Sequence, residues 1–201
     1  IQTIGEWVIE EICRQLSVWK QRYHLPEDFS ASVNLSVKQL NDDSVIHILE
    51  RQLEEHELSA SLLEVEITET VVMEKTDQNL KVLCDIHNLG ISIALDDFGT
   101  GYSSMSYLTQ LPLNVLKIDR SFVNDMETVQ GAAIVKAVVA LAKGLSLKVV
   151  AEGVETKEQL VRLKELSCDY VQGFYYSKPL ANDVLEKRFS EDFGYRGESK
   201  I

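Results

Sequence analysis

Apolar and polar positions follow two rhythms along the chain, one typical of amphipathic helices and one typical of short buried strands. Across residues 3–22, apolar side chains recur at helical spacing, which predicts a helix with one buried face. A turn-rich break follows, and the apolar stretch at residues 29–36 predicts a strand. The first two expected elements are therefore a helix and then a strand.

The same alternation continues to residue 171. We expect further strands at residues 62–68, 91–95, 115–118, 147–151 and 170–171, and further helices at residues 42–56, 75–88, 103–110, 129–143 and 157–166. Short apolar strands separated by helices are typical of parallel strands that are covered on both faces. The pattern predicts an α/β domain, and it is compatible with a barrel and with an open doubly wound sheet.

Composition is consistent with one globular domain. The chain has 201 residues, of which 45% are hydrophobic and 26% are charged, and these proportions support one substantial core. No linker, repeat or low-complexity tract interrupts the alternation. We expect a single domain at residues 1–189 and a loosely held C-terminal tail at residues 190–201.

The net charge of the chain limits the kinds of binding partner that can be expected. With 20 Lys and Arg against 32 Asp and Glu, the formal net charge is -12, which repels a phosphate backbone and argues against a nucleic acid polymer. Three widely separated cysteines indicate neither a disulfide framework nor a zinc site. No apolar run reaches the roughly 20 residues that span a bilayer. We expect a cytoplasmic domain without membrane contact of its own, although the parent protein could be membrane-anchored.

Polar side chains gather where the expected strands end. In a parallel barrel or an open parallel sheet, the carboxyl ends of the strands converge on the ligand site. These positions carry carboxylates, amides and one ammonium group: Asn34, Glu66, Asp96, Asp97, Lys117, Asp119, Glu152 and Gln172.

Such a concentration of carboxylates needs cations. Neighbouring carboxylates repel one another, and hard ions such as Mg²⁺ or Mn²⁺ prefer oxygen ligands of this kind. The adjacent Asp96 and Asp97 can reach two ions, one of them as a bridging ligand. Two ions roughly 3.5–4 Å apart can activate a water and clamp a phosphate during in-line displacement. The strand ends therefore predict phosphodiester hydrolysis at a two-metal site.

Several of these residues also have an ordinary structural interpretation. Asp96 and Asp97 could only form a turn, but two buried carboxylates at one strand end are otherwise expensive. Lys117 could extend out of the sheet, although flanking helices favour its pairing with the acidic cluster. Glu64 and Glu66 share one strand face, so the pattern does not decide between them.

The remaining candidates are weaker when taken alone. Asn34 could be a turn residue, and Gln172 beside a glycine carries little information. Glu155 could serve a helix N-terminus. The four histidines, at positions 24, 47, 56 and 87, lie away from the strand ends, which argues against a histidine-based metal site.

Six segments of the chain resemble the EAL domain family in order and in spacing. They are VNLS at 33–36, EVEITE at 64–69, DDFGTGYSS at 96–104, LKIDRSFV at 116–123, VAEGVE at 150–155 and VQGF at 171–174. The resemblance covers nearly the whole chain. It implies an α/β fold of the (β/α)8 TIM-like barrel type and hydrolysis of cyclic di-GMP to linear pGpG with two Mg²⁺ or Mn²⁺ ions.

The resemblance also implies roles for individual residues. The metal-binding set is Asn34, Glu66, Asp96, Asp97 and Glu152, with Asp96 as the bridging ligand. Lys117, Asp97 and Glu152 are the catalytic set, in which Lys117 orients the attacking water and Glu152 takes part in general-base catalysis. Asp119 and Gln172 resemble substrate-binding residues. Glu69 is similar to the glutamate that anchors the loop at 98–104, which the family links to dimerisation, and Glu155 belongs to the same supporting shell.

One departure from the family concerns its first two strands. These strands carry the EAL motif, including a metal-binding glutamate, and residues 1–22 match the helix that follows them. We therefore expect a barrel that lacks its first two strands and a chain that is inactive by itself. The alternative is a noncatalytic module that binds cyclic di-GMP or a protein. Family members often form homodimers and are often fused to sensor or GGDEF domains, which are expected partners here.

Overall fold

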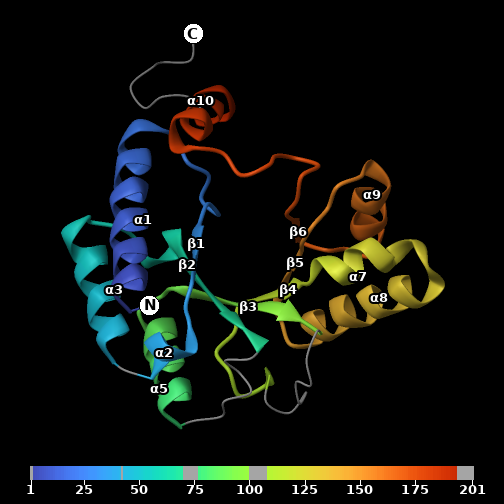
Figure 1. The fold of residues 1–201 in the computed structure, drawn as a ribbon, viewed down its shortest axis with the longest axis horizontal. Helices are drawn as coiled ribbons and strands as arrows, with labels where there is room; N and C mark the ends of the chain where they lie inside the picture. The colour runs from blue at the N-terminus through green and yellow to red at the C-terminus, as the bar shows by residue number, and fades with distance from the viewer. Residues whose placement is uncertain (1, 42, 70–76, 100–107, 194–201) are drawn as a thin grey trace.

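The computed structural model describes residues 2–41, 43–69, 77–99 and 108–193, and Figure 1 shows their arrangement. Strands and helices alternate along the chain, as the apolar pattern predicts. The expected helix at 103–110 falls mainly on residues outside the described ranges. The strands form one central sheet with helices on both flanks (Figure 1).

The sheet has six strands among the described residues, and they lie side by side in sequence order. Every neighbouring pair is parallel. A doubly wound sheet would reverse its strand order at a switch point, whereas a barrel adds strands in one direction. The order therefore decides in favour of the barrel type of α/β fold. The strands are β1 (Ala31–Asn34), β2 (Leu63–Thr68), β3 (Ser92–Phe98), β4 (Val115–Ile118), β5 (Lys148–Ala151) and β6 (Tyr170–Val171).

Helices cover the sheet in two groups. In Figure 1, α1, α2, α3 and α5 lie beside β1 to β3, while α7, α8 and α9 lie beside β4 to β6. The α-helices are α1 (Gln2–Arg22), α2 (Val37–Leu40), α3 (Ser44–Glu55), α5 (Asp77–Asn88), α7 (Arg120–Asn124), α8 (Val129–Gly144), α9 (Lys157–Glu165) and α10 (Asn182–Asp192); 3₁₀ turns occupy Ala60–Leu62 and Asp125–Glu127. None of these helices is both long and apolar enough to cross a membrane.

The core lies between the sheet and its helices. The apolar side chains of the central strands are fully buried, including Val65, Ile67, Ile93 and Leu116. Helix α1 contributes Leu16 to the same core, as its helical spacing predicts. Burial on both faces explains why the central strands read as nearly continuous apolar runs rather than as alternating ones.

Helix α10 packs against the C-terminal half of α1. Phe189 forms edge-to-face contacts with the rings of Trp19 and Phe29, at centroid distances of 5.0 and 5.7 Å. Glu186 accepts hydrogen bonds from Gln15 Nε2 at 3.1 Å and from Trp19 Nε1 at 3.2 Å. Because Phe29 precedes β1, these contacts anchor α10 near the amino end of that strand. The helix spans the expected boundary between residues 189 and 190, which stays a prediction.

Candidate functional site

A single ammonium group lies between three carboxylates at the carboxyl ends of four strands. Lys117 on β4 places its Nζ 2.8 Å from Glu66 Oε1, 3.2 Å from Asp96 Oδ1 and 2.7 Å from Glu152 Oε1. An ammonium group has three N–H donors, so these three acceptors can satisfy all of them. We call these four residues the Lys117 cluster. The expected pairing of Lys117 with the acidic residues is confirmed.

An irregularity in β3 brings two successive carboxylates into the site. Consecutive side chains of a regular strand point to opposite faces. The register of β3 with β4 shifts between Leu95 and Phe98, and Asp97 has a φ of 56°. The N–H of Asp97 donates to Asp96 Oδ1 at 3.0 Å. The bulge therefore turns Asp97 toward the same space as Asp96, as bulges beside active sites commonly do.

The resulting donor set fits a divalent cation. Carboxylate oxygens of Asp96, Asp97 and Glu152 all lie within 4.8 Å of one another. These are hard oxygen ligands from the ends of β3 and β5, the two strands on either side of β4, without competing histidine or cysteine ligands in the group. Asn34 is the register partner of Glu66 at the end of β1, and its side chain is exposed. Asn34 therefore lies directly across from Glu66 on the neighbouring strand.

The electrostatics of the site show a shortage of positive charge. Burial raises the pKa of Glu152, Lys117 opposes this shift, and Asp96 and Glu66 add to it. Burial also raises the pKa of Asp97, together with the charges of Asp96 and Asp119. For Lys117, burial lowers the pKa, but hydrogen bonds to Glu152 and Glu66 outweigh burial and raise it. One lysine does not balance these carboxylates.

The structure separates the two glutamates that the sequence left equivalent. Glu66 is 8% exposed and contacts Lys117. The carboxylate of Glu64 instead accepts hydrogen bonds from Ser32 Oγ at 3.0 Å and from Ser92 Oγ at 3.1 Å. Both glutamates share one face of β2, but Glu64 lies two residues nearer the amino end of the strand. Glu66 is therefore the member of the cluster.

The two expected substrate-binding residues lie immediately after strands. Asp119 follows β4 and accepts a hydrogen bond from Ser121 N at 3.0 Å and one from the Ser121 hydroxyl, so it caps α7. Gln172 follows β6, and its side chain is exposed. Its carbonyl oxygen accepts a hydrogen bond from Val154 N at 3.0 Å. This bond ties the β6 end to the segment that carries Glu152.

The two expected supporting residues differ in their surroundings. Glu69 is 4% exposed, and its Oε2 accepts a hydrogen bond from Gly99 N at 3.2 Å. This contact holds the chain directly after the two aspartates of β3. Glu155 is exposed and pairs with Arg120 at 3.1 Å. Within the expected loop at 98–104, residues 100–104 lie outside the described ranges.

Sequence reasoning did not single out Arg120, which lies against the turn after Glu152. Gly153 has a φ of 69°, and a Cβ atom there would come within 2.3 Å of Arg120 Cγ. Only glycine suits both the backbone angle and this approach. A glycine directly after a strand-end glutamate is the signal that could have indicated this close contact.

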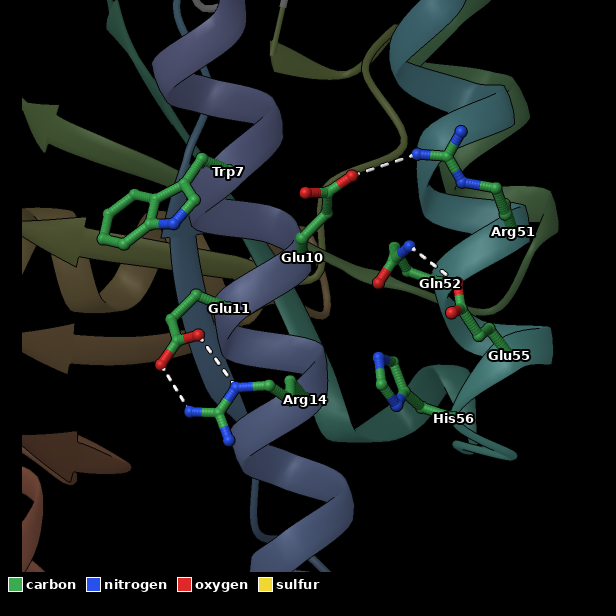
Figure 2. Close-up of a pocket in the computed structure, with 8 residues that line it drawn as sticks. All are labelled: Trp7, Glu10, Glu11, Arg14, Arg51, Gln52, Glu55 and His56. Atoms are coloured by element: carbon green, nitrogen blue, oxygen red, sulfur yellow. Dashed lines mark hydrogen bonds and ion pairs between the residues drawn. The ribbon is translucent and has the colours of Figure 1, made fainter.

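A separate hollow lies in the outer helical layer, away from the strand ends. It occupies about 620 Å³ between α1 and α3 (Figure 2). Arg51 pairs with Glu10 across the two helices at 3.1 Å, while Arg14 pairs with Glu11 along α1 at 2.6 Å. None of the residues lining this hollow is one of the expected site residues. Its volume is therefore no guide to the chemistry, which depends on the strand ends.

Comparison with known proteins identifies what the chain resembles. The family model described as "EAL domain" matches residues 1–179. The chain is 42% identical to the bifunctional diguanylate cyclase/cyclic di-GMP phosphodiesterase MucR of Pseudomonas aeruginosa, over 92% of this chain and 27% of that protein. It is 40% identical to the signaling protein YkoW of Bacillus subtilis, over 92% of this chain and 23% of that protein. The chain thus spans about a quarter of the length of these relatives.

A solved structure supports the same relationship. The structure described as "PaMucR Phosphodiesterase, c-di-GMP complex" superposes with a TM-score of 0.86 at 42% sequence identity. The match covers 92% of this chain and 74% of that one. The strand order and the matched structure therefore agree on the type of fold.

Proposed function

Because this chain belongs to the EAL domain family, we propose that it binds cyclic di-GMP and supplies the site for its hydrolysis to linear pGpG. One observation carries the proposal. Carboxylates from three strands converge on Lys117, and Asp97 adds a further carboxylate through the β3 bulge. A phosphodiester substrate is anionic, so binding at this acidic site requires cations between substrate and protein.

The proposed cofactors are two Mg²⁺ or Mn²⁺ ions. Their ligands would be the strand-end oxygens of Asn34, Glu66, Asp96, Asp97 and Glu152. When bound, such ions activate water and stabilise the charge that develops on the phosphate. Glu152 would accept a proton from the attacking water, and its raised pKa suits that role better than an ordinary carboxylate would.

The remaining residues would position these groups. Lys117 orients the attacking water through an N–H that it now donates to a carboxylate. Asp119 and Gln172 contact the substrate from the ends of β4 and β6. Glu69 holds the backbone after Asp97 through Gly99, and Glu155 supports the turn after Glu152 through Arg120.

The test is hydrolysis of cyclic di-GMP in the presence of Mg²⁺ or Mn²⁺ by a protein that carries the two expected EAL strands before this chain, with pGpG measured by chromatography. We expect pGpG with at least one of the two ions and none after chelation. Absence of pGpG with both ions from that completed domain would reject the proposed hydrolysis.

A second function fits the open sheet. Within the described residues, β1 and β6 have no strand on their outer edges, so the barrel is not closed there. Saturable binding of cyclic di-GMP without pGpG would identify a noncatalytic binding module. Absence of binding would leave a protein-interaction role. Calorimetric titration with cyclic di-GMP distinguishes these two results.

The setting of the domain is also a proposal. The relatives are about four times as long as this chain, and MucR is described as bifunctional. We propose a cytoplasmic domain in a longer parent protein with sensor or GGDEF domains, and a homodimer as its assembly. Light scattering coupled to size-exclusion chromatography would reveal the dimer, and a monomeric mass at high concentration would contradict it.

A further inference from the structure

We propose that Lys117 is the internal counterion of the site, holding the three carboxylates together while no divalent cation is bound. In this role it is a positioning residue for the cation ligands, in addition to any contact with water. The inference rests on the proposed metal site. The effect of Lys117 on the metal-free protein can be tested separately, in the presence of a chelator.

The geometry supports a counterion rather than an incidental contact. The Lys117 side chain is 4% exposed, and the side chains of its three partners are 10%, 15% and 18% exposed. Its strand, β4, lies between β3 and β5, so one side chain links groups from both neighbours and from β2. Removing one partner of a buried ion pair leaves a charge without compensation and is strongly destabilising. Lys117 therefore holds together the strand ends that form the site.

The charge balance leaves room for a cation. Three carboxylates against one ammonium leave two negative charges, and Asp97 adds a third. Without Lys117, all of these carboxylates would face one another with no positive charge from the cluster. A divalent cation at Asp96, Asp97 and Glu152 would neutralise part of the same charge. Lys117 and the cation thus compensate overlapping charges, and each should matter more when the other is absent.

The experiment compares Lys117→Met with the unchanged chain by thermal denaturation, first in chelator and then in Mn²⁺. In chelator, we expect the melting temperature to fall by about 10 °C, because a buried cluster has lost its counterion. In Mn²⁺, we expect the melting temperature of the variant to rise at least twice as much as that of the unchanged chain. Calorimetric titration with Mn²⁺ should then show tighter binding by the variant, about tenfold.

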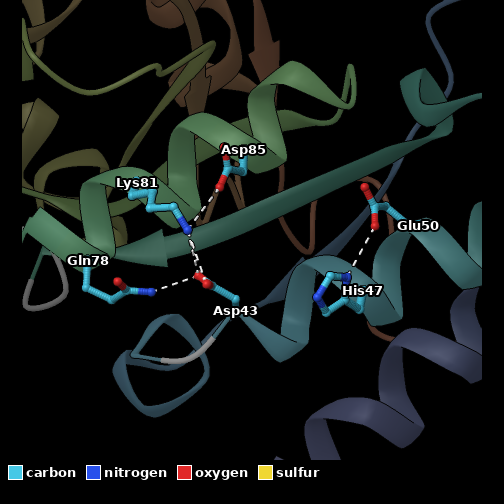
Figure 3. A network of polar contacts seen from close by, with 6 residues as sticks. All are labelled: Asp43, His47, Glu50, Gln78, Lys81 and Asp85. Atoms are coloured by element: carbon cyan, nitrogen blue, oxygen red, sulfur yellow. Dashed lines mark hydrogen bonds and ion pairs between the residues drawn. The ribbon is translucent and has the colours of Figure 1, made fainter.

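The chain offers a matched control in Lys81 (Figure 3). Lys81 also lies between carboxylates, 3.1 Å from Asp43 and 3.8 Å from Asp85, but its side chain is 56% exposed. Lys81→Met removes the same chemical group from a solvated cluster, so we expect a change within about 2 °C that Mn²⁺ does not alter. Lys117→Arg retains the charge and should lose less stability in chelator than Lys117→Met.

Each outcome is decisive. An unchanged melting temperature of Lys117→Met in chelator would overturn the counterion role, and so would an equal rise with Mn²⁺ in both proteins. If Lys117→Met does not fold in chelator, the double variant Lys117→Met/Glu66→Gln should fold, because it has one carboxylate fewer. Failure of this double variant to fold would also overturn the role. If the unchanged chain does not bind Mn²⁺, the proposed metal site is wrong. The melting temperatures in chelator still test whether Lys117 stabilises the metal-free protein.

Discussion

Among the described residues, two lysines each contact more than one carboxylate, and they differ in burial rather than in chemistry. Lys117 lies beneath the strand ends, with partners at 2.7 to 3.2 Å. Lys81 lies on α5 and contacts Asp43, at the start of α3, and Asp85, one turn along its own helix (Figure 3). Water screens the second cluster but has little access to the first. The same group is therefore expected to have unequal effects at the two positions.

The carboxylates of the two regions show this difference directly. The pKa of Asp43 is lowered, with its hydrogen bond to Lys81 as the largest cause. The pKa of Glu152 is raised, because burial outweighs a Lys117 contact that is shorter than the one at Asp43. An adjacent lysine therefore does not define the state of a carboxylate by itself. Solvation decides which effect is larger.

The largest expected difference between the two regions is in activity. Glu152→Gln keeps the shape of the side chain but removes its negative charge and its basicity. In the protein that also carries the two EAL strands, we expect hydrolysis of cyclic di-GMP to fall by a factor on the order of 10²–10⁴, the usual contribution of a general base. Asp85→Asn is the matched change beside Lys81 and should retain the original rate. Initial rates of pGpG formation measure both, and an active Glu152→Gln variant would remove Glu152 from the proposed chemistry.

A smaller difference is expected between the two glutamates on one face of β2. Glu66→Gln removes a charge from the Lys117 cluster and should weaken Mn²⁺ binding by roughly 10–100-fold. Glu64→Gln should leave the affinity within about threefold, because Ser32 and Ser92 hold that carboxylate away from the cluster. Calorimetric titration compares the two affinities. Equal losses of Mn²⁺ affinity in the two variants would mean that the cation site extends further toward the amino end of β2 than these contacts indicate.

A high salt concentration should affect the contributions of Lys81 and Lys117 to stability differently. The melting temperature should depend on Lys81 even less at 1 M NaCl than at low salt, because the screening length falls to about 3 Å. The decrease in melting temperature caused by Lys117→Met in chelator should persist at high salt, because the Lys117 cluster is buried. Thermal denaturation of both variants at two salt concentrations gives the comparison. Disappearance of the Lys117 effect at high salt would contradict its burial.

The smallest expected effect is a titration at Asp43. Its folded-state pKa lies below the ordinary aspartate pKa of 3.8, so the contact with Lys81 contributes stability above pH 3.8, and this stability is lost as the pH falls through the folded-state pKa. Lys81→Met should move the pKa of Asp43 upward toward 3.8. NMR titration of the carboxyl carbon measures this shift. An unchanged pKa would mean that Lys81 is not its cause.

Much of the fold could be predicted from local patterns. The exceptions are very short helices and a helix that packs against a distant part of the chain. The expected strand at 115–118 agrees with β4, and the expected helix at 129–143 differs from α8 by one residue. Helices α2 and α7 were not expected, because four or five residues are too few to show a helical period. Helix α10 was not expected either, and its only buried residue is Phe189, which packs on distant Trp19.

The sequence alone determined the alternation of elements, the polar residues at the strand ends and the family motifs, because these depend on neighbours along the chain. Tertiary structure decided what depends on neighbours across the sheet. Strand order selected the barrel type, the β3 bulge turned Asp97 toward Asp96, and contact with Lys117 distinguished Glu66 from Glu64. Each of these outcomes depends on the order and register of neighbouring strands, and a periodicity of two within one strand carries no information about the next strand.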